Sequence, residues 1–557
     1  MGRERVGAKN SETHQMTNES QTIDLGTFDY VIVGAGSAGC VLANRLSEDP
    51  SVKVALLEAG GKDNYLWIHI PVGYLHCMGN PRTDWGYKTA PVPGLDGRTL
   101  NYPRGRVLGG CSSINGMIYM RGQAQDYDHW QQLGNKGWGW DDVLPYFLKS
   151  EDQQAVPADD MHRAGGEWRV ETQRLQWDVL EAFRDAAAEA GIPKTNDFNR
   201  GNNEGCGYFH VNQRNGWRWN TSKGFLRPAK KRKNLTVFTH AQVKKLNIEE
   251  GRATGADLRL GDKDAHISAT GEIILSAGAI GSPQILQLSG IGGGERLQDN
   301  GIDLVHELKG VGENLQDHLQ IRCVYKVEGI PTLNERANSL IGRMGIGLEY
   351  ALSRSGPMSM APSQLGAFAK TSPEFETPNV EFHVQPLSLD KFGDPLHDFP
   401  AFTASICNLR PESRGHVSIK GPDPFTHPEI QPNYLSTPGD RLVAADSIRL
   451  ARKIAAQPAL QKLKPEEYLP GSTVDGDDDL AQAASKIGTT IFHPVSTCKM
   501  GSDDMSVVDD RLRVRGLRGL RVVDASIMPT ITSGNTNSPV IMIAEKAADM
   551  IRADKNL

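Results

Sequence analysis

Three glycines and one acidic residue near the start of the chain have the types and spacing of a dinucleotide-binding site. Gly34, Gly36 and Gly39 form a GxGxxG pattern, and Glu58 follows about twenty residues later, as in known sites of this kind. The glycines permit a tight turn, close approach of the backbone to a pyrophosphate, and close packing of a helix on a strand. A carboxylate at the position of Glu58 suits ribose hydroxyls and repels the additional phosphate of NADP. The pattern therefore predicts a site for FAD or NAD.

A strand, a helix and a second strand must hold these residues in place. Residues 28–33 are a short apolar run, typical of a buried parallel strand. Residues 37–46 carry apolar side chains at helical spacing, and residues 52–57 form a second apolar run that ends at Glu58. An isolated glycine pattern is a weak signal, but the same pattern inside this order indicates a Rossmann-like βαβ unit.

The rest of the chain predicts an α/β protein (α+β overall) with a second domain. Residues 84–140 have little periodicity and many Gly, Asn, Arg and Trp residues, which favours a long functional loop region. Residues 272–276 and 520–523 predict further strands of the first domain. Residues 310–487 are rich in Pro and in alternating segments and lack glycine fingerprints. This change in character predicts a separate domain built on an antiparallel sheet.

Composition and charge exclude several classes of protein. Of the 557 residues, 38% are hydrophobic and 23% charged, and the mean hydropathy is −0.42, values typical of a globular protein. Lys and Arg number 61 against 67 Asp and Glu, so no excess of positive charge indicates a nucleic-acid partner. No apolar stretch approaches the roughly 18 residues of a transmembrane helix. Metal catalysis and hydrolase chemistry are not expected, because the HExxH and GxSxG motifs are absent from the sequence.

The first residues of the chain and its cysteines both bear on where the protein is located. Residues 1–26 are polar and lack the apolar core of a secretory signal, so we predict a disordered leader, within which Met16 is an alternative start. The seven cysteines are scattered and form no CxxC pair. A reducing, cytoplasmic location fits this usage.

Four sequence blocks resemble the glucose-methanol-choline (GMC) oxidoreductases, flavoenzymes that oxidise alcohols, and most closely their choline-dehydrogenase-like branch. These blocks are the glycine turn with Glu58, residues 103–122, residues 277–292, and the C-terminal segments 493–501 and 522–551. The resemblance implies an FAD-binding Rossmann-like domain assembled from three separated stretches and a substrate-binding domain with an antiparallel sheet. The implied FAD domain comprises residues 27–165, 200–305 and 490–557, and the implied substrate domain comprises 166–199 and 306–489.

The resemblance also assigns residues to the cofactor. It implies Gly34, Gly36, Ala38 and Gly39 on the pyrophosphate, Glu58 on the ribose, Val107, Gly110, Asn115 and Gly116 against the isoalloxazine, Val243 near the adenine, and Ala277, Gly278, Asp524, Ala525 and Thr536 elsewhere along the dinucleotide. Some family members attach FAD through a histidine just before the asparagine of this block. Ile114 occupies that position, so we predict that FAD is bound non-covalently.

Alcohol oxidation by a flavin needs a base that removes the hydroxyl proton, and histidine suits this at neutral pH. The resemblance singles out His493, because its block presents the family's catalytic histidine, and Asn535, where the family carries His or Asn. An amide at Asn535 would donate a hydrogen bond to the substrate oxygen. The alternative is that Asn535 caps the last helix, a role for which Asn537 is better placed. His318, at the implied domain junction, is expected to make a structural hydrogen bond.

The implied substrate pocket indicates an uncharged primary alcohol, aliphatic or aryl. Its predicted lining is apolar and carries no acid: Met358, Met360, Leu365, Phe368 and Phe492. A quaternary ammonium substrate would require an aromatic cage and usually a carboxylate. Electrons are expected to pass to a quinone, a protein carrier or O2. Alternatives are a choline-type dehydrogenase, a hydroxynitrile lyase of the same fold with structural FAD, and a catalytically silent or light-driven flavoprotein.

Overall fold

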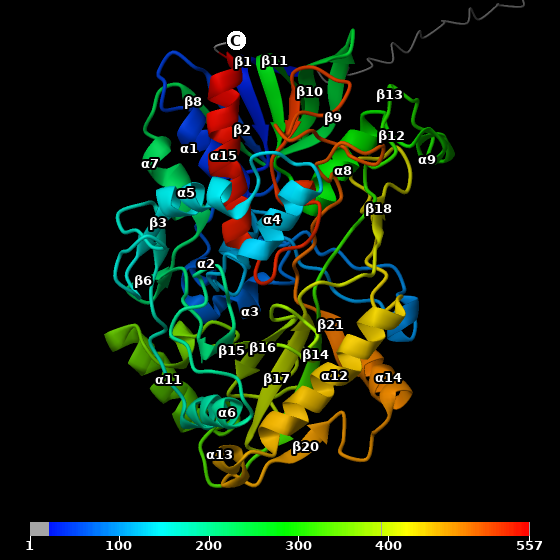
Figure 1. Cartoon of the computed structure of the whole chain (residues 1–557). Helices are drawn as coiled ribbons and strands as arrows, with labels where there is room; N and C mark the ends of the chain where they lie inside the picture. The colour runs from blue at the N-terminus through cyan, green and yellow to red at the C-terminus, as the bar shows by residue number, and fades with distance from the viewer. Residues whose placement is uncertain (1–21, 392, 556–557) are drawn as a thin grey trace, which may run out of the picture.

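Two seven-stranded sheets organise the chain, one in the upper and one in the lower half of the view in Figure 1. The structure is a computed structural model that describes residues 22–391 and 393–555. The first sheet is largely parallel and the second is antiparallel. The predicted α/β class, with a Rossmann-like domain and an antiparallel second domain, is confirmed.

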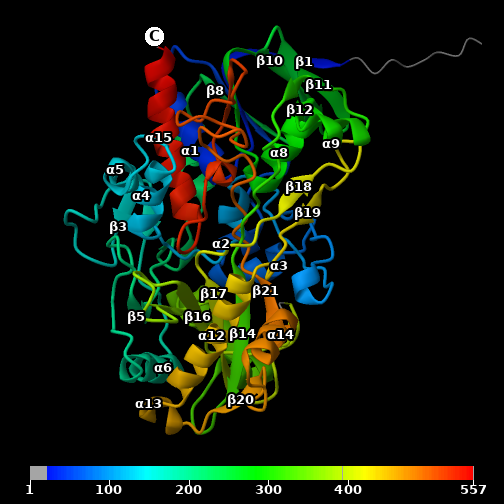
Figure 2. The same ribbon diagram turned by 45° about the vertical axis from the view of Figure 1, so that its right-hand side comes forward.

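The first sheet carries the dinucleotide fingerprint. Its strand order is β8-β2-β1-β11-β10-β9, with β22 also paired to β11. The parallel strands are β1 (Ile23–Val33), β2 (Val54–Glu58), β8 (Leu235–Thr239), β11 (Lys263–Leu275) and β22 (Leu520–Val522), and β9 (Ala241–Glu249) and β10 (Arg252–Leu260) are antiparallel. Helices α1 (Ser37–Leu46) and α15 (Asn537–Lys555) lie side by side against this sheet (Figures 1 and 2). The middle of the sheet is buried between layers, which explains why the end of β1, most of β2 and the end of β11 are continuously apolar.

The first strand starts earlier than the sequence predicts. Residues 23–26 were expected in a disordered leader, but they belong to β1, where Ile23 pairs with Ala265 and Asp24 with His266 of the long strand β11. Their polar composition hides this pairing, because they lie at the end of the sheet and are only partly buried. The remainder of the predicted leader, residues 1–21 with Met16, lies outside the described residues.

The second sheet has the order β20-β14-β17-β16-β15-β5, with β21 also paired to β14. Its strands are β5 (Gly205–Tyr208), β14 (Leu319–Lys326), β15 (Leu365–Ala369), β16 (Val380–Gln385), β17 (Ala401–Asn408), β20 (Glu466–Leu469) and β21 (Gly488–Thr490). Helices α6 (Asp178–Glu189), α12 (Pro438–Ala455) and α14 (Asp477–Ile487) form an apolar core with one face. Alternate side chains of the strands point to the opposite face.

The division of the chain into domains stays a prediction, and the structure suggests one adjustment to it. β5 pairs with β15 of the second sheet, although the resemblance assigned residues 200–305 to the FAD domain. Its short sequence of small residues, GCGY, gives little strand signal of its own. We therefore assign β5 to the substrate domain.

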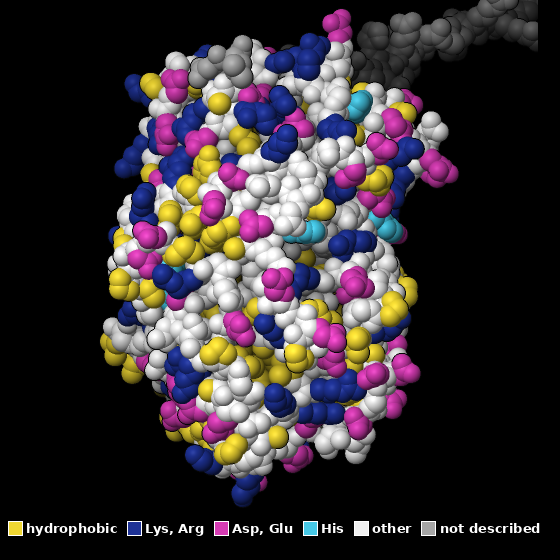
Figure 3. Space-filling view, in the orientation of Figure 1, with side chains coloured by type: hydrophobic (Ala, Val, Ile, Leu, Met, Phe, Trp, Pro, Cys, Tyr) yellow, Lys and Arg dark blue, Asp and Glu magenta, His cyan; other side chains and the backbone are white. Residues whose placement is uncertain are grey.

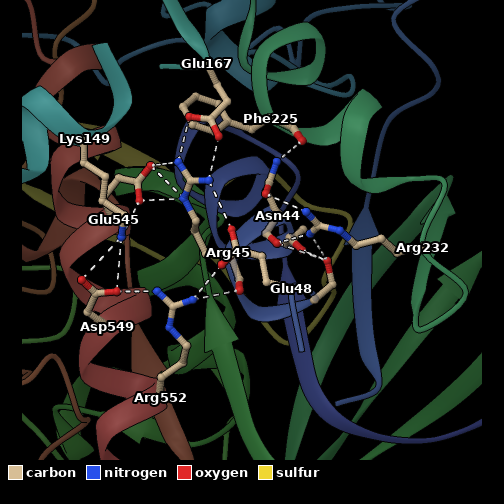
Figure 4. Close-up of polar contacts among 12 residues, drawn as sticks. Asn44, Arg45, Glu48, Lys149, Glu167, Phe225, Arg232, Glu545, Asp549 and Arg552 are labelled. Carbon is tan, nitrogen blue, oxygen red and sulfur yellow. Dashed lines mark hydrogen bonds and ion pairs between the residues drawn. The ribbon is translucent and has the colours of Figure 1, made fainter. Parts of the chain in front are cut away.

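A buried ionic cluster joins the two ends of the first domain (Figure 4). Arg45 of α1 lies 2.7 Å from Glu545 of α15 and 2.8 Å from Glu167. Glu545 is fully buried, and it also lies 3.2 Å from Lys149. A buried charge of this kind is costly unless it is paired, so α1 and α15 depend on each other. On the face in Figure 3, by contrast, acidic and basic side chains alternate at the surface.

Candidate active site

One continuous cavity of about 1020 Å³ runs between the two sheets. Gly34 and Glu58 line one end of it, and His383 and His493 line the other. This volume is at the upper end for small-molecule sites, which is what a dinucleotide together with a substrate requires. The two ends of the cavity differ in chemistry: glycines and an acid line one, and histidines line the other.

The dinucleotide end is shaped by glycines at the start of α1. Gly34 has a φ of +101°, and a Cβ atom there would lie 2.5 Å from the carbonyl oxygen of Ser276. Gly36 precedes α1, whose first turn has no side-chain cap. Its backbone N–H groups are therefore open to an anion, as a pyrophosphate site requires.

Glu58 lies at the end of β2, as the motif predicts. Its Oε2 accepts a hydrogen bond of 2.9 Å from the N–H of Ala35, and its Oε1 accepts one of 2.8 Å from the N–H of Gly60. Burial raises the pKa of Glu58 to about 7, against the effect of these two hydrogen bonds. Each carboxylate oxygen has a further lone pair, so Glu58 can still accept hydrogen bonds from ribose hydroxyls.

The structure brings most of the predicted cofactor residues to the cavity. Those that line it are Gly34, Gly36, Ala38, Glu58, Gly110, Asn115, Gly116, Val243, Ala277, Gly278, Asp524, Ala525 and Thr536. Gly39 and Val107 do not. A Cβ atom at Gly39 would lie 1.9 Å from the carbonyl oxygen of Gly34, which makes Gly39 a packing position. Val107 is buried in an apolar cluster with Ile114.

Two further observations fit a flavin dinucleotide at this end. Asn537 at the start of α15 lines the cavity, and its side-chain nitrogen is buried without a hydrogen-bond partner. Asp524 lies where β22 ends and accepts hydrogen bonds from Ser282 and from the N–H of Gly278. Burial raises the pKa of Asp524. Open backbone donors, an acid at the ribose position and an unpartnered amide are the groups that would hold FAD.

His493 and Asn535 meet at the other end of the cavity. His493 follows β21, and its backbone N–H donates a hydrogen bond of 2.7 Å to Asp317 Oδ1. Asn535 precedes α15, and its Nδ2 lies 3.1 Å from His493 Nε2. Two residues 42 positions apart are thus brought into contact, because the chain returns to the first sheet through β22 between them. Asn535 Oδ1 is buried and has no hydrogen-bond partner among the described residues.

A third residue, His318, determines the tautomer of His493. His318 Nε2 lies 3.1 Å from the carbonyl oxygen of Leu409, which can only accept, so this nitrogen carries the proton. In a neutral ring, His318 Nδ1 then has a lone pair, and it lies 3.1 Å from His493 Nδ1. His493 Nδ1 must therefore be the protonated nitrogen. The lone pair of His493 is left on Nε2, which faces Asn535 and the cavity.

The electrostatics keep both rings neutral at neutral pH. Burial, and next the neighbouring His318, lower the pKa of His493 well below its ordinary value. Burial also lowers the pKa of His318. A neutral imidazole with an unprotonated Nε2, which here accepts a hydrogen bond from Asn535 Nδ2, can accept a proton from a substrate, so His493 has the properties of a general base. The sequence predicted only a structural hydrogen bond for His318; it makes one to Leu409 and contacts His493 as well.

The substrate end differs in part from the predicted pocket. Met358, Met360 and Phe492 line the cavity as expected. Leu365 and Phe368 do not: Leu365 belongs to the core between the second sheet and its helices, and Phe368 packs in a cluster with Phe198 and Phe209. Both lie on β15, which is buried along its whole length.

Strands β14 and β16 supply the lining residues that the sequence argument missed: Gln320, Arg322, His383 and Gln385. Polar residues alternate with apolar ones in QIRCVYK and in EFHVQ, and this period of two indicates a polar face.

No group of His, Cys, Asp or Glu within the described ranges could hold a metal ion. Among the helices of the described part, none has the length and apolar character to cross a membrane.

Comparison with known proteins agrees with this site. Models of the GMC oxidoreductase family match residues 28–320 and 411–544. The chain belongs to the GMC oxidoreductase family. A GMC relative from Pseudomonas putida, named alcohol dehydrogenase [acceptor], is 42% identical over 527 residues, which cover 94% of this chain and 95% of the relative.

Two other members are similarly related along their whole length. The oxygen-dependent choline dehydrogenase of Photobacterium profundum is 42% identical and covers 94% of this chain and 93% of its own. The crystal structure of pyridoxine 4-oxidase from Mesorbium loti superimposes with a TM-score of 0.86 at 31% identity, covering 94% of this chain and 98% of that one. This GMC oxidoreductase therefore shares its fold with enzymes of different substrates, so its own specificity must come from the cavity.

Proposed function

We propose that this protein is an FAD-dependent oxidoreductase that oxidises the CH–OH group of a primary alcohol to the aldehyde. The observation that carries the proposal is the lone pair of His493 Nε2, held beside Asn535 at the end of the cavity. The names of the relatives, alcohol dehydrogenase and choline dehydrogenase, support the same reaction class.

Each residue has a defined part in this reaction. The substrate hydroxyl donates a hydrogen bond to His493 Nε2, which takes its proton as the alcohol is oxidised. Asn535 donates a hydrogen bond to the substrate oxygen and so stabilises its developing negative charge. His318 keeps His493 in the tautomer that can accept the proton. FAD, when bound, accepts the hydride that leaves the carbinol carbon. Ile114 carries no nucleophile at the position of covalent attachment, so the proposal includes non-covalent FAD.

The electron acceptor and the location are the finer parts of the proposal. We favour a quinone or a protein carrier over O2, in line with the name of the Pseudomonas putida relative. A cytoplasmic location is supported by the cysteines, since all seven are free thiols and six of them are buried.

A choline-type substrate is less favoured by the charges at the substrate end. Arg322 and Arg343 line this part of the cavity, and Asp394 is the carboxylate among its described lining residues there. Asp394 is exposed at the cavity mouth. A quaternary ammonium group would meet the positive charge of Arg322, and the buried carboxylate of Glu381 does not line the cavity to offset it.

The experiment is anaerobic mixing of the purified flavoprotein with a panel of primary alkanols, aryl alcohols and choline. Loss of the oxidised flavin absorbance with the neutral alcohols is expected, and His493→Ala with flavin still bound should abolish it. Rapid recovery in air would identify an oxidase, and slow recovery a dehydrogenase. Absence of flavin reduction with every alcohol would contradict the proposal and favour a lyase or a silent flavoprotein.

A further inference from the structure

A row of polar side chains crosses the floor of the cavity away from the catalytic pair. Arg322 of β14 stands opposite Ser405 of β17, and Ser405 stands opposite His383 of β16. Residues that are directly opposite on neighbouring strands point to the same face of the sheet. Arg322 and His383 both line the cavity, and Ser405 is buried between them on the same face of the sheet.

These side chains make no hydrogen bonds with the described residues of the protein. Within the part of the chain that the structure describes, the Arg322 side chain makes no hydrogen bond or ion pair. Ser405 Oγ and both ring nitrogens of His383 have no hydrogen-bond partner, although these residues are only 0% and 1% exposed. His383 Nε2 lies 3.2 Å from Glu381 Oε1, but the carboxylate oxygens of Glu381 also make no hydrogen bond. Buried polar atoms almost always have partners, so this row is arranged for a ligand.

The charge of the row is positive. Burial lowers the pKa of Arg322 to about 10, while Asp390 acts in the opposite direction, so the guanidinium remains a cation at neutral pH. Asp390 is largely exposed and is paired with His397. Glu381 is not among the residues that line the cavity. An anion that reached Arg322 would therefore meet an unpaired cation in a partly desolvated site, where charge-assisted hydrogen bonds are strongest.

We propose that Arg322 and His383 bind a carboxylate at the far end of the substrate, so that the preferred alcohol is an ω-hydroxycarboxylate. This inference rests on the proposed function, because it takes the hydroxyl end to lie at His493. A guanidinium matches the geometry of a carboxylate with two parallel hydrogen bonds, and a His383 N–H supplies a further donor.

The spacing of the row from the catalytic pair is consistent with such a substrate. His318, which contacts His493, and Arg322 lie on the same stretch of chain, four positions apart. At about 3.3 Å per residue of strand, their Cα atoms are about 13 Å apart. Several methylene groups would be needed between hydroxyl and carboxylate, and Met358 and Met360 supply apolar walls for them. The sequence alone indicated an uncharged alcohol, because segment 356–368 has no charge and Arg322 lies outside it.

The test compares matched substrates in the holoenzyme. Anaerobic flavin reduction is measured with a series of ω-hydroxycarboxylates and with the 1-alkanols of the same chain length. Fatty carboxylates without a hydroxyl are measured as competitive inhibitors of alkanol oxidation. The variants are Arg322→Gln and Arg322→Lys, and the matched control is Arg513→Gln, which removes the same charge from an exposed site that does not line the cavity.

We expect Arg322→Gln to raise KM for the hydroxycarboxylates and the inhibition constant of the fatty carboxylates by about 10- to 100-fold. KM for the matched alkanols should change little. Arg322→Lys should recover part of the loss, and Arg513→Gln should have a small effect because its exposed charge is screened and lies outside the cavity. A wild-type enzyme that does not favour the carboxylate over the matched alkanol, or an Arg322→Gln variant that weakens both alike, would overturn the inference. Failure of the proposed function is distinguishable, because then neither series would reduce the flavin.

Discussion

The hydrogen bond between the two histidines of the active site leads to a quantitative prediction. His318→Leu removes the acceptor of the His493 Nδ1 proton, which lies 3.1 Å away, and also the donor to the carbonyl of Leu409. Leucine cannot form these hydrogen bonds but has a similar volume, and His318 does not line the cavity, so the cavity keeps its shape. His493 then loses the hydrogen bond that favours the tautomer with the proton on Nδ1. In the other tautomer Nε2 carries the proton and cannot act as a base.

The size of the effect follows from the cost of an unpaired buried group. A buried donor that loses its partner costs about 1–3 kcal/mol. If this cost raises the free energy of the reactive tautomer, with its proton on Nδ1, the rate constant of flavin reduction falls by about 5- to 150-fold. His318→Asn is the matched variant, because its Oδ1 can take the place of Nδ1 as acceptor, and it should retain most of the rate.

The assay is anaerobic rapid mixing with saturating alcohol, with flavin content and circular dichroism as checks of folding. Reduction that is as fast in the Leu variant as in the wild type would refute the reasoning about the tautomer. Equal losses in the Leu and Asn variants would also refute it, since the acceptor would then be irrelevant.

Four other predictions concern single residues. Burial and the neighbouring ring of His318 lower the pKa of His493, and a base is active only when it is unprotonated. We therefore expect kcat/KM to stay high through neutral pH and to fall only below about pH 6.5, the ordinary histidine pKa. A fall in kcat/KM that begins near pH 8 would contradict this. Glu545→Gln removes a fully buried partner of the cluster in Figure 4 and should lower the free energy of unfolding by about 3 kcal/mol in urea titrations. Glu48→Gln, in the same cluster but with a side chain that is 40% exposed in its pairs with Arg45 and Arg552, should cost less than about 1 kcal/mol. Gly34→Ala places a Cβ atom 2.5 Å from a backbone oxygen and should yield protein without flavin by its visible spectrum. With Ile114 at the attachment position, acid precipitation should release all flavin to the supernatant; retention in the pellet would be the contrary result.

The elements with strong local patterns could be predicted from the sequence. The glycine pattern with Glu58 identified β1, α1 and β2, because a parallel strand buried on both faces is apolar throughout. The resemblance, by contrast, places β5 in the FAD domain, although β5 pairs with β15 of the second sheet. This pairing depends on residues more than 150 positions away, so no local sequence pattern reveals it.

The same distinction applies to the site. His493 and Asn535 were found through their sequence blocks, but their contact at 3.1 Å and the role of His318 depend on three segments that meet only in the fold. The row that contains Arg322 was missed because its three members lie on three strands. Each of them alone is an ordinary polar residue, and only the strand register places them together.

The position of β22 in the first sheet has a consequence for synthesis of the protein. β22 (Leu520–Val522) pairs with β11, and the start of α15 supplies Asn535, Thr536 and Asn537 to the cavity. A nascent chain that has not yet reached β22 has its glycine turn but lacks one wall of the flavin site. Tight capture of FAD must therefore wait until β22 and the start of α15 have been synthesised, and truncation before β22 should give a product that does not retain flavin.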